Sequence, residues 1–484
     1  MATTIYADTT PLLEAIAASD TDRILHETIS LLGAQNVPAA KIAGRVGLAA
    51  LWGNADPHAL TTLATVGRVS TWMRTIPAGP EPGDNVRRSL APTYPLAQAF
   101  LAVADAVHKG LPEPHPSLPE PVLPGELKEG QTVYSAIQDA YGRRDLNAIR
   151  ALLMGYHATG ADYRSFQTAI YGALVHRYPE GGHPLIFALS GCHVLDMAEW
   201  GDHEPPLIYW YPPLMLDTTP DAPAAEIASD YAAQAAHDLS WLRTRLSIPH
   251  EEPAGASFQR ALLASDGVAA CDAVLGALRS GATPRGIVSG MSLAVAAHIN
   301  AVPQGDSAQL SHLGHVLQYV HSVQLAMRHT QETLVFPMLY TAACVTNSLG
   351  PVGSPALQGA AGALVAGGLI PGVVLRSLEQ QAAAGEGDGA LATARRYIQM
   401  GHPPSGLAGI LATVAAQRDV AGNEDALHLL PAVTAACEAY LMLPGAIAEK
   451  GQNALLAAAV RLASESRGAT SLADRVRPAI EAAI

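Results

Sequence analysis

Apolar residues recur along most of this chain at the three- and four-residue spacing of amphipathic helices, and short polar breaks separate the apolar runs. The breaks are rich in glycine, proline, asparagine and aspartate, which interrupt helices. The pattern predicts helices over residues 10–33, 41–52, 58–72, 163–176, 183–200, 281–297, 310–329, 403–417 and 428–443.

One arrangement occurs four times: an alanine-rich helix, a polar break, and a histidine at the head of a second helix. The histidine follows the start of the first helix by 20, 21, 31 and 24 residues, and the third unit has the longer loop. A helix pair buries its apolar face by stacking on its neighbours. We therefore predict an all-α fold of four repeated helical-pair units in one bundle- or solenoid-like domain. The predicted units are 1–76, 131–260, 261–350 and 351–484.

The segment 77–130 differs from the rest because it is rich in proline. One helical stretch, near Leu96–His108, interrupts it. We predict an extended connection wrapped over the surface. Covering an active site and simply linking two units are equally compatible with its composition.

Composition and charge narrow the class of protein. Abundant alanine with few aromatic residues favours helix over sheet. The net charge is −14 and there is no basic stripe, which argues against a nucleic-acid partner. No signal peptide is evident, and the uncharged run 333–375 is glycine-rich, so we predict a buried helix pair there rather than a membrane span. A cytoplasmic protein with four buried thiols is expected, at Cys192, Cys271, Cys344 and Cys437.

The four histidines that head the second helices are the candidate chemistry. A single histidine at a helix start usually packs or caps, but four at equivalent positions predict a shared metal ion. The set contains no cysteine thiolate, so iron or copper with an open coordination position is favoured over structural zinc. The predicted ligands are His58, His183, His315 and His428.

Other residues are alternatives or additions to this site. His312, three residues before His315, competes with it as the ligand of the third unit. Three further residues are alternative ligands or acid–base groups: His193, His321 and Glu438. A carboxylate would complete a facial triad, but the sequence does not rank Asp196, Asp202, Glu204 and Glu438.

An aromatic and proline-rich stretch follows the second histidine helix, over residues 200–215. Its aromatic side chains are predicted to line a pocket for a flat substrate, although packing in the core would use the same residues. The candidate substrate-binding residues are Tyr209, Trp210, Tyr211 and, in the third unit, Tyr319.

Short motifs resemble a known family. Gly182-His-Pro-Leu-Ile-Phe187, Val194-Leu-Asp-Met-Ala-Glu-Trp200 and His203-Glu-Pro-Pro-Leu207 are similar to segments of the questin oxidase-like family. The related helical region ahead of some Rieske ferredoxin domains shares them. In the third unit the similarity covers Ala282-Thr-Pro284 and residues 315–328. The chain has no Cys-x-His pair, so the Rieske cluster itself is not expected.

The resemblance implies an oxygenase that opens polyketide rings such as anthraquinones. It also implies a non-haem iron held by the four predicted histidines and by a carboxylated lysine. The lysine does not match, because Ser190 stands seven residues after His183, where a lysine is expected. Lys41 is only a remote candidate. A different set of iron ligands or a changed activity follows if the lysine is missing.

The leading hypothesis is a non-haem iron-dependent oxygenase that acts on a small aromatic molecule with dioxygen. Two alternatives are a non-catalytic helical-repeat scaffold whose histidines cap helices, and a protein that binds haem through a pair of histidines. The sequence does not define the metal, the substrate or the electron source. It also leaves the oligomeric state open, and a homodimer is among the states that it allows.

Overall fold

The computed structural model describes residues 7–111, 114–174, 179–216, 222–238, 241, 253–264, 266–330, 333–352, 370–420, 424–443, 450–465 and 469–484. These residues form helices and connecting segments without any strand, so the predicted all-α class is confirmed. Part of the uncharged run 333–375 lies outside the described residues, and the prediction of a helix pair there concerns that part.

The helices have the following bounds, in chain order: α1 Thr10–Ala17, α2 Thr21–Ile29, η1 Ser30–Ala34, α3 Ala39–Trp52, α4 Pro57–Met73, α5 Asp84–Leu90, α6 Thr93–Ala102, α7 Ala104–Gly110, η2 Pro124–Glu126, α8 Val133–Gly142, α9 Leu146–Ala158, α10 Tyr163–Gly172, α11 Pro179–Met197, α12 Glu204–Leu216, α13 Ala222–Asp238, α15 Ala256–Leu262, α16 Gly267–Arg279, α17 Pro284–Ala301, α18 Ser307–His329, η3 Thr333–Val335, α19 Phe336–Asn347, α20 Pro371–Ala383, α21 Gly387–Gln399, α22 Pro404–Ala416, α23 Glu424–Met442, α24 Lys450–Glu465 and α25 Ser471–Ala482.

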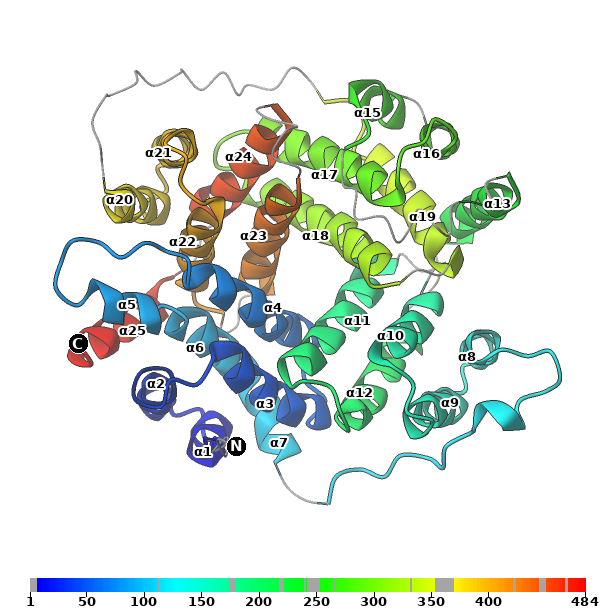
Figure 1. Ribbon diagram of the computed structural model, residues 1–484, viewed down its shortest axis with the longest axis horizontal. Helices are drawn as coiled ribbons and strands as arrows, with labels where there is room; N and C mark the ends of the chain where they lie inside the picture. The colour runs from blue at the N-terminus through cyan, green and yellow to red at the C-terminus, as the bar shows by residue number, and fades with distance from the viewer. Residues whose placement is uncertain are drawn as a thin grey trace.

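Four helices form a closed ring at the centre of the molecule. Helix α4 packs on α11, α11 on α18, α18 on α23, and α23 returns to α4 (Figure 1). The preceding helix of each pair lies outside the ring: α3 contacts α4 and α11, α10 contacts α11 and α18, α17 contacts α18, and α22 contacts α23 and α4. The ring therefore brings together one helix from each predicted unit, while the repeat itself stays a prediction.

A small residue of α3 allows a close contact with the ring helix α11. A Cβ atom placed on Gly47 would lie 2.5 Å from Cγ1 of Val194 on α11. Such a distance is shorter than carbon atoms tolerate, so α11 approaches α3 this closely only because the position is glycine. The contact fixes α11 beside α4, against which α3 also packs.

Two sequence predictions of helix boundaries were wrong. The predicted helix over 10–33 is divided, because Ser19 has a φ of +53° and the Asp20 side chain caps a new helix by accepting from the Arg23 backbone N–H at 3.1 Å. In the segment 77–130, α5 lies in a part that was predicted to be extended, whereas α6 and α7 correspond to the helical stretch predicted near Leu96–His108. Gln98 on α6 is buried and donates to the Arg418 carbonyl at 2.8 Å, so this part belongs to the core.

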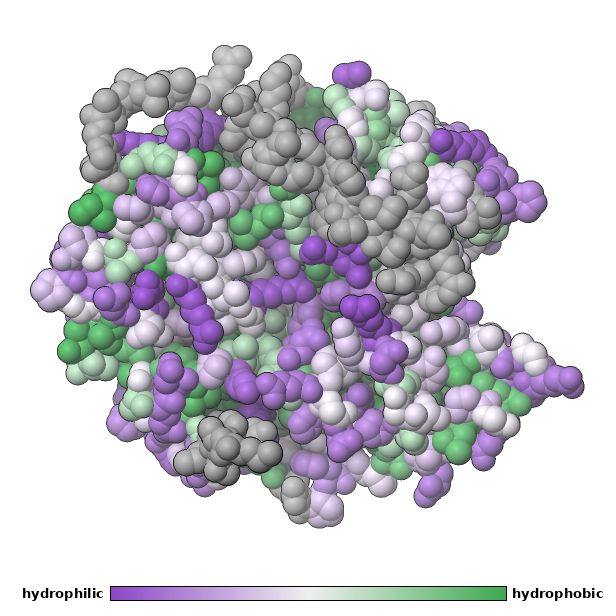
Figure 2. Space-filling view, in the orientation of Figure 1, coloured by the Kyte–Doolittle hydropathy of each residue, from purple (hydrophilic) through white to green (hydrophobic). Residues whose placement is uncertain are grey.

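The cysteines and the helix surfaces complete the fold. Three thiols are buried and Cys344 is partly exposed, with its Sγ 3.6 Å from Sγ of Cys271. None of the described helices is long and apolar enough to cross a membrane. On the face shown in Figure 2, hydrophilic side chains gather near the centre, where the ring of helices lies in Figure 1.

Candidate metal centre

The four predicted histidines meet inside the ring, and we call this set the imidazole layer: His58, His183, His315 and His428. The Nε2 atoms of His58 and His183 are 3.2 Å apart. One ligand atom from each of His58, His183 and His428 lies within 4.8 Å of the others. Imidazole nitrogens at this separation can share one metal ion.

Helix α4 positions His58 through its N-cap. One carboxylate oxygen of Asp56, Oδ1, accepts from the backbone N–H groups of His58 and Ala59, both at 3.0 Å. The same oxygen lies 3.6 Å from Nδ1 of His58. Asp56 therefore both begins the helix and faces the ring nitrogen that does not approach His183, as outer carboxylates do in metal sites.

A glycine turn positions His183. Gly181 and Gly182 have φ angles of +70° and +83°, which side-chain-bearing residues rarely adopt. A Cβ on Gly182 would also lie 2.0 Å from Cδ2 of Tyr319. Tyr319 is thus buried against this turn, where it supports His183 rather than presenting its ring to a substrate.

His315 enters the layer differently from the other three histidines. The sequence predicted it at the head of its helix, but α18 begins at Ser307, so His315 lies two turns inside. Its Nε2 is 2.8 Å from the Gly181 carbonyl and must donate to it. Its Nδ1 is buried and has no partner among the described residues. The nitrogen of His315 that is available to a metal is therefore Nδ1.

The environment keeps the imidazoles of His183, His315 and His428 neutral. Burial, followed by the neighbouring imidazoles, lowers the pKa of His183 to about 3 and that of His428 to about 3. Burial also lowers the pKa of His315 to about 4, although its hydrogen bond with Gly181 opposes the change. Neutral imidazole is the form that binds metal, so near neutral pH the lone pairs of these rings are ready for a cation.

Further along the same helices is a second polar set, which we call the ionic layer: Arg68, His193, His321 and Glu438. Arg68, His193 and Glu438 each follow the imidazole-layer histidine of their own helix by ten residues. Arg68 donates to Glu438 through Nη1 and to His193 through Nη2. His321 Nε2 is 2.9 Å from the same Glu438 oxygen, Oε2.

A cavity of about 50 Å³ lies between the two layers. Its lining consists of the third, sixth, seventh and tenth residues after each of the four histidines, so all four helices present the same face to it. Ser190, at one of these positions, donates to the Thr61 hydroxyl at 2.9 Å. This common register links the imidazole layer to the ionic layer, and the sequence reasoning missed it together with Arg68.

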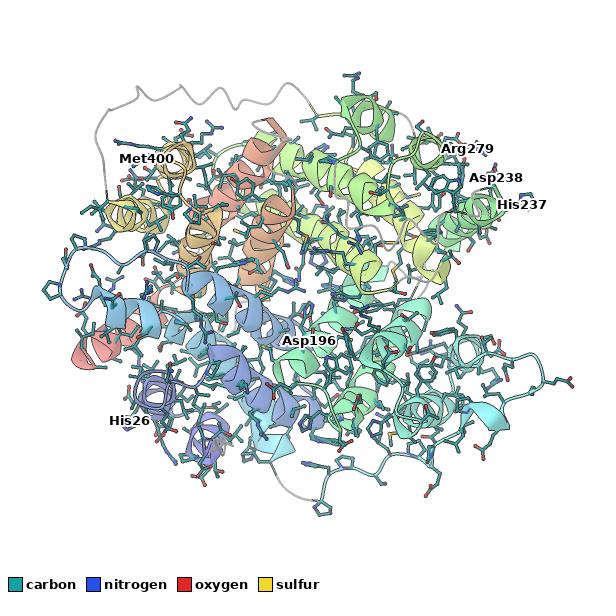
Figure 3. All side chains as sticks on the ribbon, viewed as in Figure 1. His26, Asp196, His237, Asp238, Arg279 and Met400 are labelled. Carbon is teal, nitrogen blue, oxygen red and sulfur yellow. The ribbon has the colours of Figure 1, made fainter. Side chains whose placement is uncertain are left out.

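Most alternative ligands do not adjoin the imidazole layer. His312 is exposed, so in the third unit it is His315 that lies in the layer. His193, His321 and Glu438 belong to the ionic layer, where Arg68 already supplies a cation. Other histidines lie far out, such as His26 on α2 and His237 on α13 (Figure 3).

The remaining carboxylates and the candidate lysine are engaged elsewhere. Asp196, labelled on α11 in Figure 3, accepts from Trp200 Nε1 at 2.6 Å. Glu204 pairs with His157, and Asp202 is exposed. Lys41 Nζ lies 2.9 Å from Glu199 in an exposed ion pair, so it does not supply the lysine of the resemblance.

The predicted substrate aromatics of α12 serve packing instead. Trp210 is fully buried and donates through Nε1 to the Ala55 carbonyl at 2.8 Å. Tyr211 is buried and donates to the Pro184 carbonyl at 3.0 Å. Both bonds hold α12 against segments next to His58 and His183. Tyr209 is half-buried, with the Arg150 guanidinium over its ring.

Comparison of the chain with family models, curated proteins and solved structures finds no match. The chemistry of the site therefore has to be argued from its own atoms. A set of neutral imidazoles with no anionic ligand suits a transition-metal ion and does not suit the oxygen-seeking ions Mg²⁺ and Ca²⁺.

Proposed function

We propose that the imidazole layer holds one non-haem iron ion and that the protein is an oxygenase of a small aromatic, polyketide-like molecule. The observation that carries this proposal is the approach of His58, His183 and His428, whose ligand atoms lie within 4.8 Å of one another. Neutral imidazoles at this distance can hydrogen-bond to one another in pairs, as the 3.2 Å between Nε2 of His58 and Nε2 of His183 allows. A metal ion satisfies all of them at once.

Three further features support a metal at this position. The pKa values of His183 and His428 are lowered to about 3, so the ligands need not lose protons near neutral pH. His315 lies beside this group, with its ring centroid 4.5 Å from that of His183, and is the candidate fourth ligand. Asp56 Oδ1 lies 3.6 Å from Nδ1 of His58 and favours the tautomer with its proton on Nδ1 and its lone pair on Nε2. When bound, iron would supply an open position for dioxygen and would polarise a substrate oxygen.

The resemblance to questin oxidase-like proteins supports iron and dioxygen, with one departure. The serine in place of the expected lysine, Ser190, bonds to Thr61 in the cavity below the imidazoles. The ligand set proposed for this chain is therefore all-histidine. This difference makes a changed substrate or a changed reaction outcome part of the proposal.

The aromatic class of substrate is supported by Phe187. Its ring stacks on that of His183, with centroids 5.1 Å apart and planes 13° apart, and it meets His58 edge-on. A flat apolar ring thus borders the metal position on α11. A substrate ring binding beside the metal would meet apolar surface there and polar atoms on the cavity side.

Elemental analysis of protein purified without added metal tests the proposal. The wild type is expected to carry about one iron per chain, and His183→Ala is expected to lose it. His312→Ala is the matched control, because this exposed histidine lies on α18 one turn before His315.

The other possible results of the elemental analysis point to different functions. Copper or zinc in place of iron would replace the oxygenase by another metal-dependent activity. A Soret band after addition of haem, lost in His183→Ala, would favour the haem alternative. Absence of metal from all three proteins, with equal melting temperatures after chelation, would leave the scaffold hypothesis.

A further inference from the structure

The cavity between the imidazole layer and the ionic layer has a polar wall that is only partly satisfied. Its volume is about 50 Å³, which accommodates a small number of water molecules. Gln318 and His321 are among the residues that line it, and Oε1 of Gln318 and Nδ1 of His321 are buried without a partner among the described residues. A buried acceptor without a donor costs about 1–3 kcal/mol, so two in one cavity point to a bound donor.

The two acceptors are placed for one donor molecule. Gln318 and His321 are three residues apart on α18, which puts them on one face of the helix, one turn apart. Water donates two hydrogen bonds, and polar cavities of this size hold ordered water rather than remaining dry. A water molecule that donates to both Gln318 Oε1 and His321 Nδ1 would give each of these acceptors a hydrogen-bond donor.

The protonation state of His321 follows from its partner. Burial raises the pKa of Glu438, but Arg68 and then His321 outweigh burial and hold this pKa well below its usual value. The ionised carboxylate only accepts, so His321 must donate its Nε2–H to Glu438 over 2.9 Å. This bond uses Nε2, so Nδ1 is the nitrogen left for a second partner, and His321 is among the residues that line the cavity.

His193 differs from His321 in its hydrogen bonds. Its Nε2 accepts from Arg68, and burial followed by Arg68 holds its pKa well below the usual value. Of the two ionic-layer histidines, only His321 combines a lone pair on the cavity with a carboxylate behind the opposite nitrogen. That arrangement is the one that stabilises an imidazolium.

We propose that this cavity is an internal water site and that His321, backed by Glu438, accepts protons from the imidazole layer through it. The source of the proton rests on the proposed function: a substrate hydroxyl that binds beside the imidazoles loses its O–H bond to the water. The water gives one of its own protons to Nδ1 of His321, forming an N–H bond. The imidazolium is then paired with the Glu438 carboxylate, and the water is unchanged.

Hydroxyl groups extend the path on the cavity side. Ser190 donates to Thr61 at 2.9 Å, and the two residues follow His183 and His58 by seven and three positions. A hydroxyl both donates and accepts, so this pair can pass a proton by rotating. The path therefore runs from the imidazole layer past Thr61 and Ser190 to His321.

The water site is tested on metal-free wild-type protein, without any activity. A crystal structure is expected to show a water molecule within hydrogen-bonding distance of Gln318 Oε1 and His321 Nδ1. ¹⁵N NMR of histidine-labelled protein, assigned with His321→Gln, is expected to show Nε2 protonated and Nδ1 unprotonated at pH 7. A dry cavity, or a proton on Nδ1, would overturn the proposal whatever the metal content proves to be.

The proton transfer is tested with metal-loaded protein and phenol as the probe. Release of the phenol proton, followed by stopped flow with a pH indicator, is expected to slow about tenfold or more in His321→Gln. His26→Gln, which changes an exposed histidine on α2, is the matched control and is expected to keep the wild-type rate, while added imidazole is expected to restore part of the rate in His321→Gln. Equal rates in the wild type and His321→Gln would overturn the relay. Failure of metal loading would instead count against the proposed function, and the cavity test would remain decisive for this inference.

Discussion

The imidazole layer and the ionic layer both place histidines between the same four helices. Both bury histidines, and both draw side chains from α4, α11, α18 and α23. The ionic layer contains its own cation, because the Arg68 guanidinium donates to His193 and Glu438. The imidazole layer has no cation of its own, and the nitrogens of His58 and His183 face each other at 3.2 Å.

The difference teaches where a metal belongs in this molecule. Buried lone pairs are costly unless a donor or a positive charge meets them. In the ionic layer the guanidinium meets the Glu438 carboxylate and Nε2 of His193, so these two groups are already paired with a cation. The four histidines of the imidazole layer include no such cation, so an added metal ion is expected to bind there first. The following predictions act on one layer and leave the other as the reference.

Acid should have the largest effect, through the imidazole layer of metal-free protein. Because the pKa values of His183, His428 and His315 are lowered to about 3, 3 and 4, the unfolded chain binds protons between about pH 6.5 and pH 4 that the folded chain does not. The free energy of unfolding should therefore fall with acidification, by at most about 4 kcal/mol per pH unit for the three groups together.

Urea unfolding in the presence of a chelator, at pH values from 7.5 to 5, measures this slope. His428→Asn should lower the slope, since it removes one of the groups that titrate. A slope that is the same in this variant and in the wild type would assign the acid sensitivity to another part of the molecule.

Removing the internal cation should be the next largest effect. Arg68→Ala leaves Glu438 buried without its counter-charge, and such a change costs about 3–5 kcal/mol of unfolding free energy. Chemical denaturation gives the value. The double variant Arg68→Met with Glu438→Met is the matched control and should lose much less, because both charges are removed.

Binding of cobalt(II) tests whether the Arg68 guanidinium takes the place of a metal ion in the ionic layer. In Arg68→Ala, His193, His321 and Glu438 become a set of two histidines and a carboxylate without a cation. Added cobalt(II) should recover part of the lost stability and raise the metal content above that of the wild type. If cobalt(II) stabilises the wild type and the variant equally, the guanidinium does not occupy a metal-competent position.

Metal binding to the wild type should have an intermediate effect. Iron(II) at a hundredfold excess over its dissociation constant adds about 2.7 kcal/mol to the free energy of unfolding. The gain should vanish in His58→Ala and persist in His312→Ala. Differential scanning calorimetry under anaerobic conditions measures it, and an equal gain in His58→Ala would place the ion outside the imidazole layer.

The smallest effect is expected at the histidine just outside the layer. His312 is exposed, so His312→Ala should change the free energy of unfolding by no more than about 0.5 kcal/mol. Its iron content should equal that of the wild type. Loss of iron in this variant would show that the third unit contributes His312 as a ligand after all.

The sequence predicted the elements of the site better than their contacts. Helix periodicity and the repeated break before a histidine located His58, His183 and His428 at helix starts, and the structure brings them together. Periodicity says nothing about which distant side chains meet, so the pairing of Arg68 with Glu438 was not foreseen. The register of ten residues from His58, His183 and His428 to Arg68, His193 and Glu438 was the signal available in the sequence.

Other errors have local causes. The bond from His315 to the Gly181 carbonyl depends on a glycine turn in another unit, which no local pattern of α18 reveals. The aromatic composition of residues 200–215 is compatible with a pocket and with a core, so the sequence leaves both open for Trp210 and Tyr211. Their bonds to the carbonyls of Ala55 and Pro184 decide in favour of the core.

The closure of the ring also has a consequence for how the protein folds. The first and last ring helices, α4 and α23, are joined side by side although Arg68 and Glu438 are 370 residues apart in the chain. Contacts between residues so far apart in the chain form late, because a long loop must close, at a cost in conformational entropy, before the contacts can stabilise the fold. The imidazole layer is therefore complete only when nearly the whole chain has been made and packed. Metal uptake would then mark the end of folding, and a chain truncated before α23 would keep many of its helices but lack the centre.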